Sequence, residues 1–141
     1  MEYKIENYLE PKEYNELRNS VGWDSKDENV IIAAINNSAI VKRITMNNKA
    51  VGMARAIGDG VYYLIVDVVV DKEYQGKGIG KILIEEIVKE VYEKTQKGQK
   101  ASINLVSMQG KEEFYEKCGF RRIPYDFTGY GMIKRIEKWK I

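Results

Sequence analysis

The sequence predicts a mixed α/β domain in which helices cover a central sheet. Two helical patterns near the start precede three strand-like segments, and a glycine-rich turn then joins the most apolar of these segments to a long amphipathic helix. The chain has 141 residues, of which 44% are hydrophobic, enough to bury a core. Because the sequence shows no internal repeat and no linker, we expect residues 1–141 to form one domain.

Four segments before the glycine-rich turn predict strands: Tyr3–Tyr8, Ser38–Met46, Ala50–Ile57 and Val61–Val70. The last is almost wholly apolar, as is typical of a central strand covered on both faces. Asn47 and Asn48 tolerate positive φ and therefore predict a tight hairpin turn between the second and third strands. Lys12–Ser20, which follows Pro11, and Asp27–Ile35 have helical patterns.

After the turn, apolar residues at helical spacing predict a helix that ends near Lys97-Gly98: Ile79, Leu83, Ile87 and Val91. A strand over Ala101–Val106 and a short helix over Glu112–Lys117 follow, and Gly119 ends that helix. Phe120–Ile123 and Met132–Ile136 predict two closing strands. The expected architecture is a mixed central sheet of six to seven strands flanked by about four helices.

Charge and hydropathy exclude several classes of partner. The 23 Lys and Arg residues against 21 Asp and Glu give a net charge of +2, so no large field favours nucleic-acid or membrane binding. The longest apolar run, around Val61–Val70, is broken by Asp67 and is shorter than the roughly 20 residues that span a bilayer. The polar opening Met1–Glu10 does not fit a secretory signal, so we expect a cytoplasmic protein.

The counts of histidine and cysteine restrict the chemistry. With 0 His and 1 Cys, the chain cannot form a Ser-His-Asp or Cys-His nucleophilic site, a zinc site of His and Cys ligands, or an internal disulfide. We predict no metal, although carboxylates alone could still hold one.

The glycine-rich turn between strand and helix predicts a phosphate site. Gly76, Gly78 and Gly80 allow a sharp turn, and main-chain N–H groups can then converge on an anion at the positive end of the helix. Lys77 and Lys81 could add charge. A Walker A loop fails because Gln75 replaces its first glycine and Ile82 its Ser or Thr.

A dinucleotide fingerprint starting at Gly76 and Gly78 also fails, because Lys81 replaces its third glycine. The pattern that remains is Gln-x-x-Gly-x-Gly, formed by Gln75, Gly78 and Gly80.

This pattern resembles the pyrophosphate motif Gln/Arg-x-x-Gly-x-Gly/Ala of the GNAT superfamily of acyl-CoA-dependent N-acyltransferases. In that family the motif follows the fourth strand and opens the third helix, as it does in the order predicted here. The stretch from Phe114 to Phe120 is similar to the family's Phe-Tyr-x-x-x-Gly-Phe segment. Met108 and Lys111 depart from the family, which often has Asn and Ala at these places. The resemblance implies a GNAT fold and acetyl-CoA as co-substrate.

The resemblance also implies roles for individual residues. Backbone amides of the turn would hold the pyrophosphate: Gln75, Gly76, Lys77, Gly78, Ile79, Gly80 and Lys81. The strand end at Val68, Val69 and Val70 would pair with the pantetheine amides, and an N–H near Val69 or Val70 would polarise the thioester carbonyl. Tyr115 is the candidate acid, since a phenol of pKa about 10 stays protonated at neutral pH. For Phe114 we favour packing.

The general base is open, because no histidine is present. Asp67 is the ionisable residue of the apolar central strand, and it is either a structural hydrogen-bonding group or a base of perturbed pKa facing the cleft. The resemblance implies an acceptor pocket between two loops that here carry Trp23-Asp24 and Pro124–Tyr130, aromatic and acidic residues that suit a cationic amine.

We therefore predict transfer of acetyl from acetyl-CoA to a primary amine of a small molecule or peptide, by direct attack in a ternary complex. Two alternatives stay open: a non-catalytic acyl-CoA sensor, and an acetyltransferase for protein lysines or N-termini. Family members are often dimers, which leaves a homodimer open as well.

Overall fold

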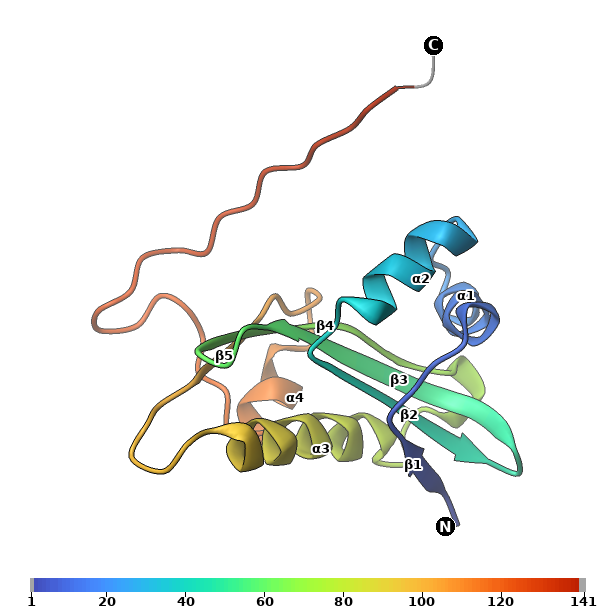
Figure 1. Ribbon diagram of the computed structural model, residues 1–141, viewed down its shortest axis with the longest axis horizontal. Helices are drawn as coiled ribbons and strands as arrows, with labels where there is room; N and C mark the ends of the chain where they lie inside the picture. Colours follow the sequence, from blue (N-terminus) through green and yellow to red (C-terminus); the bar gives the residue numbers. More distant parts are fainter. Residues whose placement is uncertain (1, 140–141) are drawn as a thin grey trace. The chain divides into compact units, whose positions relative to one another are not determined.

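A computed structural model of the chain, which describes residues 2–139, contains a five-stranded sheet in the order β1-β2-β3-β4-β5 (Figure 1). The strands are β1 (Lys4–Glu6), β2 (Ile40–Met46), β3 (Lys49–Gly58), β4 (Tyr62–Val70) and β5 (Ser102–Leu105). Neighbouring strands are antiparallel except β4 and β5, which are parallel. As predicted, Asn47 and Asn48 adopt positive φ in the β2–β3 turn.

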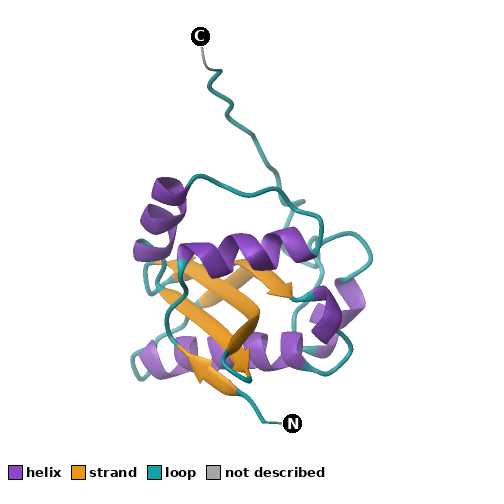
Figure 2. Ribbon diagram, turned by 90° about the vertical axis from the view of Figure 1, so that its right-hand side faces the viewer, coloured by secondary structure: helices purple, strands orange, loops and turns teal. Residues whose placement is uncertain are grey.

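The helices are α1 (Pro11–Ser20), α2 (Glu28–Asn36), α3 (Ile79–Lys94) and α4 (Glu112–Lys117), with a short 3-10 turn, η1, over Lys72–Tyr74. Helix α3 packs against β2, β3 and β4, and α1 packs against β3, β4 and α2. Figures 1 and 2 show the sheet between α3 on one face and α1 on the other. The apolar face of α3 is fully buried, as its helical spacing predicts.

Two compact units make up the chain, Met1–Val106 and Ser107–Ile141. The first contains the whole sheet with α1, α2 and α3, and the second contains α4. A single domain over residues 1–141 stays a prediction.

The two predicted closing strands are wrong. Residues 120–123 and 132–136 are not strands, and the sheet has five strands rather than six to seven. A strand persists where a neighbour completes its hydrogen bonds and one of its faces is buried. Here Met132 and Ile136 are 96% and 82% exposed, so the alternating segment has no buried face to stabilise a strand.

A partly buried ion pair joins the sheet to α3. The Lys42 ammonium, on β2, donates to Glu90 Oε1 at 2.6 Å and to Asn7 Oδ1 at 2.8 Å, while Lys94 lies 2.9 Å from Glu90 Oε2. Burial raises the pKa of the Glu90 carboxyl, but the hydrogen bonds from Lys42 and Lys94 outweigh it, and the net pKa is lowered. The ionised carboxylate therefore stabilises the folded state.

Replacing Glu90 by Gln should lower the free energy of unfolding at pH 7 by about 1–3 kcal/mol, because a buried ammonium loses its counter-charge. The pKa of Glu90 in the folded state lies below the ordinary 4.5. The stability difference between wild type and Glu90→Gln should therefore be full above pH 4.5 and disappear as the pH falls through the folded-state pKa. Urea unfolding across pH 3–7 measures it. Glu85→Gln, on the exposed side of the same helix, is the control and should change little. Equal effects of the two variants would contradict the assignment.

Candidate functional site

The glycine-rich turn connects β4 to α3 through η1. The Asp71 carboxylate accepts from the Glu73 N–H at 2.9 Å, and the Tyr74 N–H donates to the Asp71 carbonyl at 2.8 Å. The Gln75 side chain then returns to β4, where its Nε2 donates to the Val70 carbonyl at 3.1 Å. These contacts fix the turn to the end of the strand, so the start of α3 is held beside β4.

The N-terminus of α3 has free hydrogen-bonding capacity. Its first helical hydrogen bond runs from the Ile82 N–H to the Gly78 carbonyl at 3.2 Å, so the N–H groups of Ile79, Gly80 and Lys81 have no partner within the helix. Gly78, at the N-cap, has no side chain to accept from them, and the first turn contains no acidic residue. A 16-residue helix therefore presents its positive end uncompensated, which suits an anion.

The predicted phosphate-binding residues thus lie together in one turn. Gly78 has φ +84°, a conformation that glycine adopts without strain. The Lys81 side chain forms a 3.8 Å ion pair with Glu85, but both side chains are about 60% exposed, so the pair is weak. The Lys81 ammonium remains accessible to an anion at the helix end.

One edge of β4 is open beside this turn. The parallel pairing of β4 with β5 covers residues 62–65, and within residues 2–139 no strand pairs with that edge along residues 66–70. The Asp71 N–H donates to the Val51 carbonyl on β3 at 2.8 Å, so by strand alternation the Val70 N–H faces the open edge. This edge can pair with an extended ligand, as the resemblance implies for Val68, Val69 and Val70.

A bulge interrupts β4 just before this edge. Arg55 pairs with Val66 and Met53 pairs with Val69, so Asp67 and Val68 together oppose Ala54 of β3. Asp67 has φ +54°, a conformation that costs a non-glycine residue about 1–3 kcal/mol and persists only where the surrounding structure holds it.

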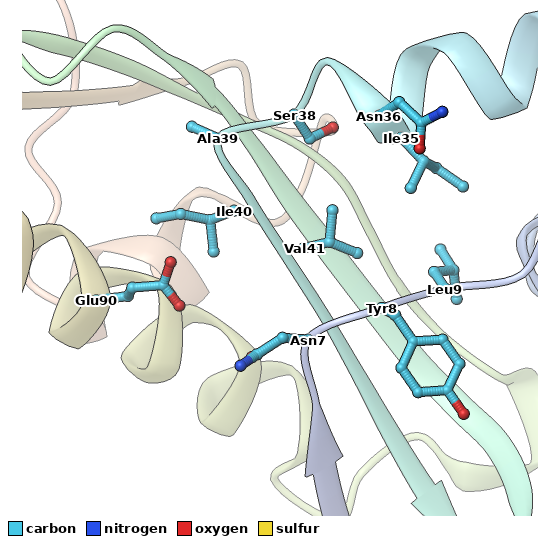
Figure 3. A pocket seen from close by; sticks show the side chains of 10 residues that line it. All are labelled: Asn7, Tyr8, Leu9, Ile35, Asn36, Ser38, Ala39, Ile40, Val41 and Glu90. Carbon is cyan, nitrogen blue, oxygen red and sulfur yellow. The ribbon is translucent and has the colours of Figure 1, made fainter.

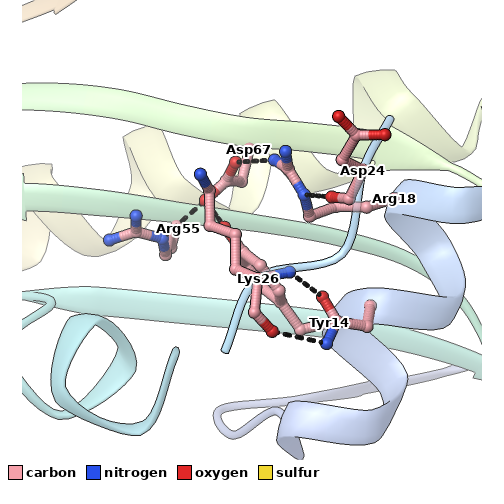
Figure 4. Close-up of polar contacts among 7 residues, drawn as sticks. Tyr14, Arg18, Asp24, Lys26, Arg55 and Asp67 are labelled. Atoms are coloured by element: carbon pink, nitrogen blue, oxygen red, sulfur yellow. Dashed lines mark hydrogen bonds and ion pairs between the residues drawn. The ribbon is translucent and has the colours of Figure 1, made fainter. Parts of the chain in front are cut away.

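Four side chains, which we call the Asp67 clamp, hold this conformation (Figure 4): Tyr14, Arg18, Arg55 and Asp67. The Tyr14 hydroxyl and the Arg55 Nε each donate to Asp67 Oδ2 at 2.8 Å, and the Arg18 guanidinium lies 3.5 Å from Oδ1. Arg18 also donates to the Asp24 carbonyl at 2.8 Å. The two arginines and the aspartate are each 13% exposed. The clamp joins α1, β3 and β4.

These contacts bear on both readings of Asp67. Burial raises the pKa of the Tyr14 phenol, and its hydrogen bond to Asp67 raises it further, so the hydroxyl remains a donor. A proton taken from an amine would have to compete with this donor and two guanidinium groups for the same oxygens. The contacts favour the structural reading, and a role for Asp67 as base stays a prediction.

In the second unit, Tyr115 lies in α4, and the Phe-Tyr-x-x-x-Gly-Phe segment forms a helix C-cap. The Gly119 N–H donates to the Glu116 carbonyl at 3.0 Å and the Phe120 N–H to the Tyr115 carbonyl at 3.1 Å, the Schellman pattern, with φ +93° at Gly119. The Tyr115 ring forms edge-on contacts with the rings of Phe114 and Phe120, whose centroids are 5.0 and 6.1 Å away. The spacing of the motif therefore has a structural cause.

The packing around the Tyr115 ring affects the pKa of its phenol. Burial raises the pKa of Tyr115, with a smaller contribution from Cys118, so the hydroxyl stays protonated at neutral pH and can donate a hydrogen bond.

Arginines cover two of the aromatic rings predicted to form an acceptor pocket. The Arg18 guanidinium lies 5.2 Å from the Trp23 ring centroid, and the Arg121 guanidinium 4.5 Å from that of Tyr125. The Trp23 ring belongs to the first unit and the Tyr125 ring to the second. A common acceptor pocket stays a prediction.

A separate pocket of about 430 Å³ lies where β2 meets the segment after β1 (Figure 3). Tyr8, Ile35 and Glu90 are among its lining residues, and none of the predicted site residues lines it. Among residues 2–139, no group of three or more His, Cys, Asp or Glu side chains could hold a metal ion. In the same range, no helix is long and apolar enough to span a membrane.

Tyr14, Arg18 and Arg55 are site residues that the sequence did not predict. A signal existed for Arg55: it is a lone charge in the segment Ala50–Ile57, next along the chain to the strand whose lone charge is Asp67. Opposite charges in two adjacent antiparallel strands can pair, and these do. Nothing in the sequence pattern indicated that α1 would supply the other two side chains.

Comparison with known proteins is consistent with this geometry. The model of the acetyltransferase (GNAT) domain family matches residues 26–122. The uncharacterized N-acetyltransferase ycf52 of Pyropia yezoensis is 32% identical over 122 residues, covering 83% of this chain and 68% of that protein. Histone acetyltransferase TAP1 of Glycine max is 31% identical over 80% of this chain, and the aligned part is 52% of its length. The chain thus spans about half of this relative.

A solved structure has the same fold. The crystal structure of a protein of unknown function from meticillin-resistant Staphylococcus aureus, described as a probable acetyltransferase, superposes with a TM-score of 0.81 at 26% identity. The match covers 95% of this chain and 100% of that chain.

The positive φ at Gly78 leads to a test of the turn. Gly78→Ala should lower the free energy of unfolding by about 1 kcal/mol, because alanine disfavours this conformation. Gly80→Ala is the matched control: Gly80 lies inside α3, where alanine is the better helix former, so stability should stay equal or rise. Urea unfolding measures both, and a loss of stability in the control alone would contradict the turn geometry.

Proposed function

The chain belongs to the GNAT family of acetyltransferases, and from this premise we propose that it transfers the acetyl group of acetyl-CoA to a primary amine by direct attack in a ternary complex. The observation that carries the proposal is the uncapped N-terminus of α3 beside the open edge of β4. The first suits a pyrophosphate, and the second suits the extended amide-bearing arm of the same molecule. Acetyl-CoA would supply an acetyl group activated as a thioester.

The chain's own groups have distinct tasks in this proposal. The amides of residues 75–81 hold the pyrophosphate with help from Lys77 and Lys81, and the main chain of residues 68–70 binds the extended arm. An N–H near Val69 or Val70 polarises the thioester carbonyl, and the N–H of Val70 faces the open edge. Tyr115 donates a hydrogen bond to the departing thiolate, a role that its raised pKa supports.

The acceptor amine must lose a proton before it attacks, and no histidine is available to take it. Because Tyr14, Arg18 and Arg55 already contact the Asp67 carboxylate, we favour an ordered water chain or a tyrosine as the group that takes this proton. Localisation in the cytoplasm and assembly as a homodimer stay predictions.

A protein lysine is the second candidate acceptor. One relative, from Glycine max and 31% identical to this chain, is named histone acetyltransferase TAP1, and this similarity favours a lysine acceptor. A free-thiol assay on two panels, one of lysine peptides and one of small amines, distinguishes the candidates. Tight acetyl-CoA binding without turnover on either panel would favour a non-catalytic sensor.

Reversing charge at the start of α3 should weaken CoA binding. In Lys81→Glu a carboxylate occupies the first turn of the helix and competes for the same amides, so calorimetry should show at least a tenfold higher Kd for acetyl-CoA. Lys89→Glu makes the same charge change on the exposed face of the same helix and should bind as wild type. Equal weakening in both variants would indicate general electrostatics rather than a site at the helix end.

Removing the Tyr115 hydroxyl should slow turnover. Tyr115→Phe keeps the ring packing, so we expect kcat to fall about 10–100-fold while the Kd for acetyl-CoA stays within about twofold. Because the phenol pKa is raised above its usual 10, the wild-type rate should not decline between pH 7 and 9.5 through loss of this proton. Tyr92→Phe, an exposed hydroxyl on α3, is the control. An unchanged kcat in Tyr115→Phe would remove this residue from the mechanism.

A further inference from the structure

The bulge in β4 places a strained residue immediately before the part of the strand that the proposed function uses. Asp67 has positive φ, and three residues later the Val70 N–H faces the open edge. Strained backbone persists where the surrounding structure holds it, and it is concentrated at functional sites.

The Asp67 clamp does not extend into the glycine-rich turn. Its members come from α1, β3 and β4, and their polar contacts run to one another, to Ser38 and to the Asp24 carbonyl. The Arg18 guanidinium also lies over the rings of Tyr14 and Trp23, at 5.7 and 5.2 Å from their centroids. The carboxylate is thus anchored from three directions, and the backbone of Asp67 is fixed through its side chain.

A bulge adds a residue to one strand and bends it. Before the bulge, β4 pairs with β5 on one edge and β3 on the other; beyond it, the pairing with β3 continues while that with β5 has ended. We propose that Tyr14, Arg18 and Arg55 are positioning residues that act through the Asp67 carboxylate to hold this bulge, and thereby direct the outward amide of Val70 toward acyl-CoA. The proposal rests on the proposed function, whose cofactor it concerns.

Two substitutions of Asp67 separate positioning from base catalysis. Asn tolerates positive φ, and its carbonyl oxygen can still accept from Tyr14 and Arg55, so Asp67→Asn should keep the Kd for acetyl-CoA within about twofold and kcat within about fivefold. Val accepts no hydrogen bond and disfavours positive φ, so Asp67→Val should raise that Kd at least tenfold. If Asp67 were instead the general base, Asp67→Asn would lower kcat at least 100-fold and leave the Kd unchanged. That result would overturn the proposal.

Tyr14→Phe tests whether the clamp acts through Asp67. It removes one donor and should raise the Kd about threefold, but it should have no further effect when combined with Asp67→Val. Additive effects of the two substitutions would contradict action through the carboxylate. Glu90→Gln serves as the stability control, because it weakens the fold away from the clamp and should bind acetyl-CoA as wild type.

Each variant is first compared with wild type by thermal unfolding, and binding is measured by calorimetry well below its melting temperature. If Asp67→Val does not fold, Tyr14→Phe and Asp67→Asn still decide between the two roles. Wild-type affinity in Asp67→Val would overturn the positioning role while leaving the proposed function intact. Failure of the wild-type chain to bind acetyl-CoA would instead overturn the proposed function, and this role with it.

Discussion

The path of β4 depends on one carboxylate that two guanidinium groups and a phenol hold in place. Asp67 accepts from Arg55 and Tyr14 at 2.8 Å and lies 3.5 Å from Arg18, and these contacts offset the cost of its positive φ. Breaking one partner of such a cluster leaves a charge that is neither paired nor well hydrated. Beyond this bulge β4 pairs with β3 alone, and Gln75 then ties the turn before α3 to the Val70 carbonyl.

The second constraint is the uncapped start of α3. A helix of 16 residues without a capping side chain or an acidic first turn keeps its positive end unneutralised, and Gln75 ties the preceding turn to the carbonyl of Val70. The same strand thus leads from the clamp, past the open amide of Val70, to the helix end. In the second unit, the Schellman cap explains why Gly119 and Phe120 follow Tyr115 at fixed spacing. Their N–H groups complete the hydrogen bonds at the end of α4, and the Phe120 ring contacts that of Tyr115.

Much of the fold and the glycine-rich turn could be predicted from the sequence, because their sequence signals are local. Asn47-Asn48 predicts a hairpin, the spacing from Ile79 to Val91 predicts a buried helix face, and Gln75, Gly78 and Gly80 predict the turn. The contribution of α1 to the clamp could not be predicted, because Tyr14 and Asp67 are 53 residues apart and meet through tertiary packing. The closing strands were wrong for a related reason: alternation predicts a strand only where a partner exists, and Ile136 is 82% exposed. The acceptor could not be predicted either, because it depends on loops whose positions in space are not determined by local sequence patterns.

A backbone amide NMR titration of the wild-type chain with acetyl-CoA tests the assigned cofactor site most directly. We expect the largest chemical-shift changes at the N–H groups of residues 76–81 and of Val70, and none at the residues lining the pocket beside Asn7 and Glu90. Shifts confined to that pocket, or none at saturating acetyl-CoA, would contradict the assignment of the strand edge and helix end as the cofactor site.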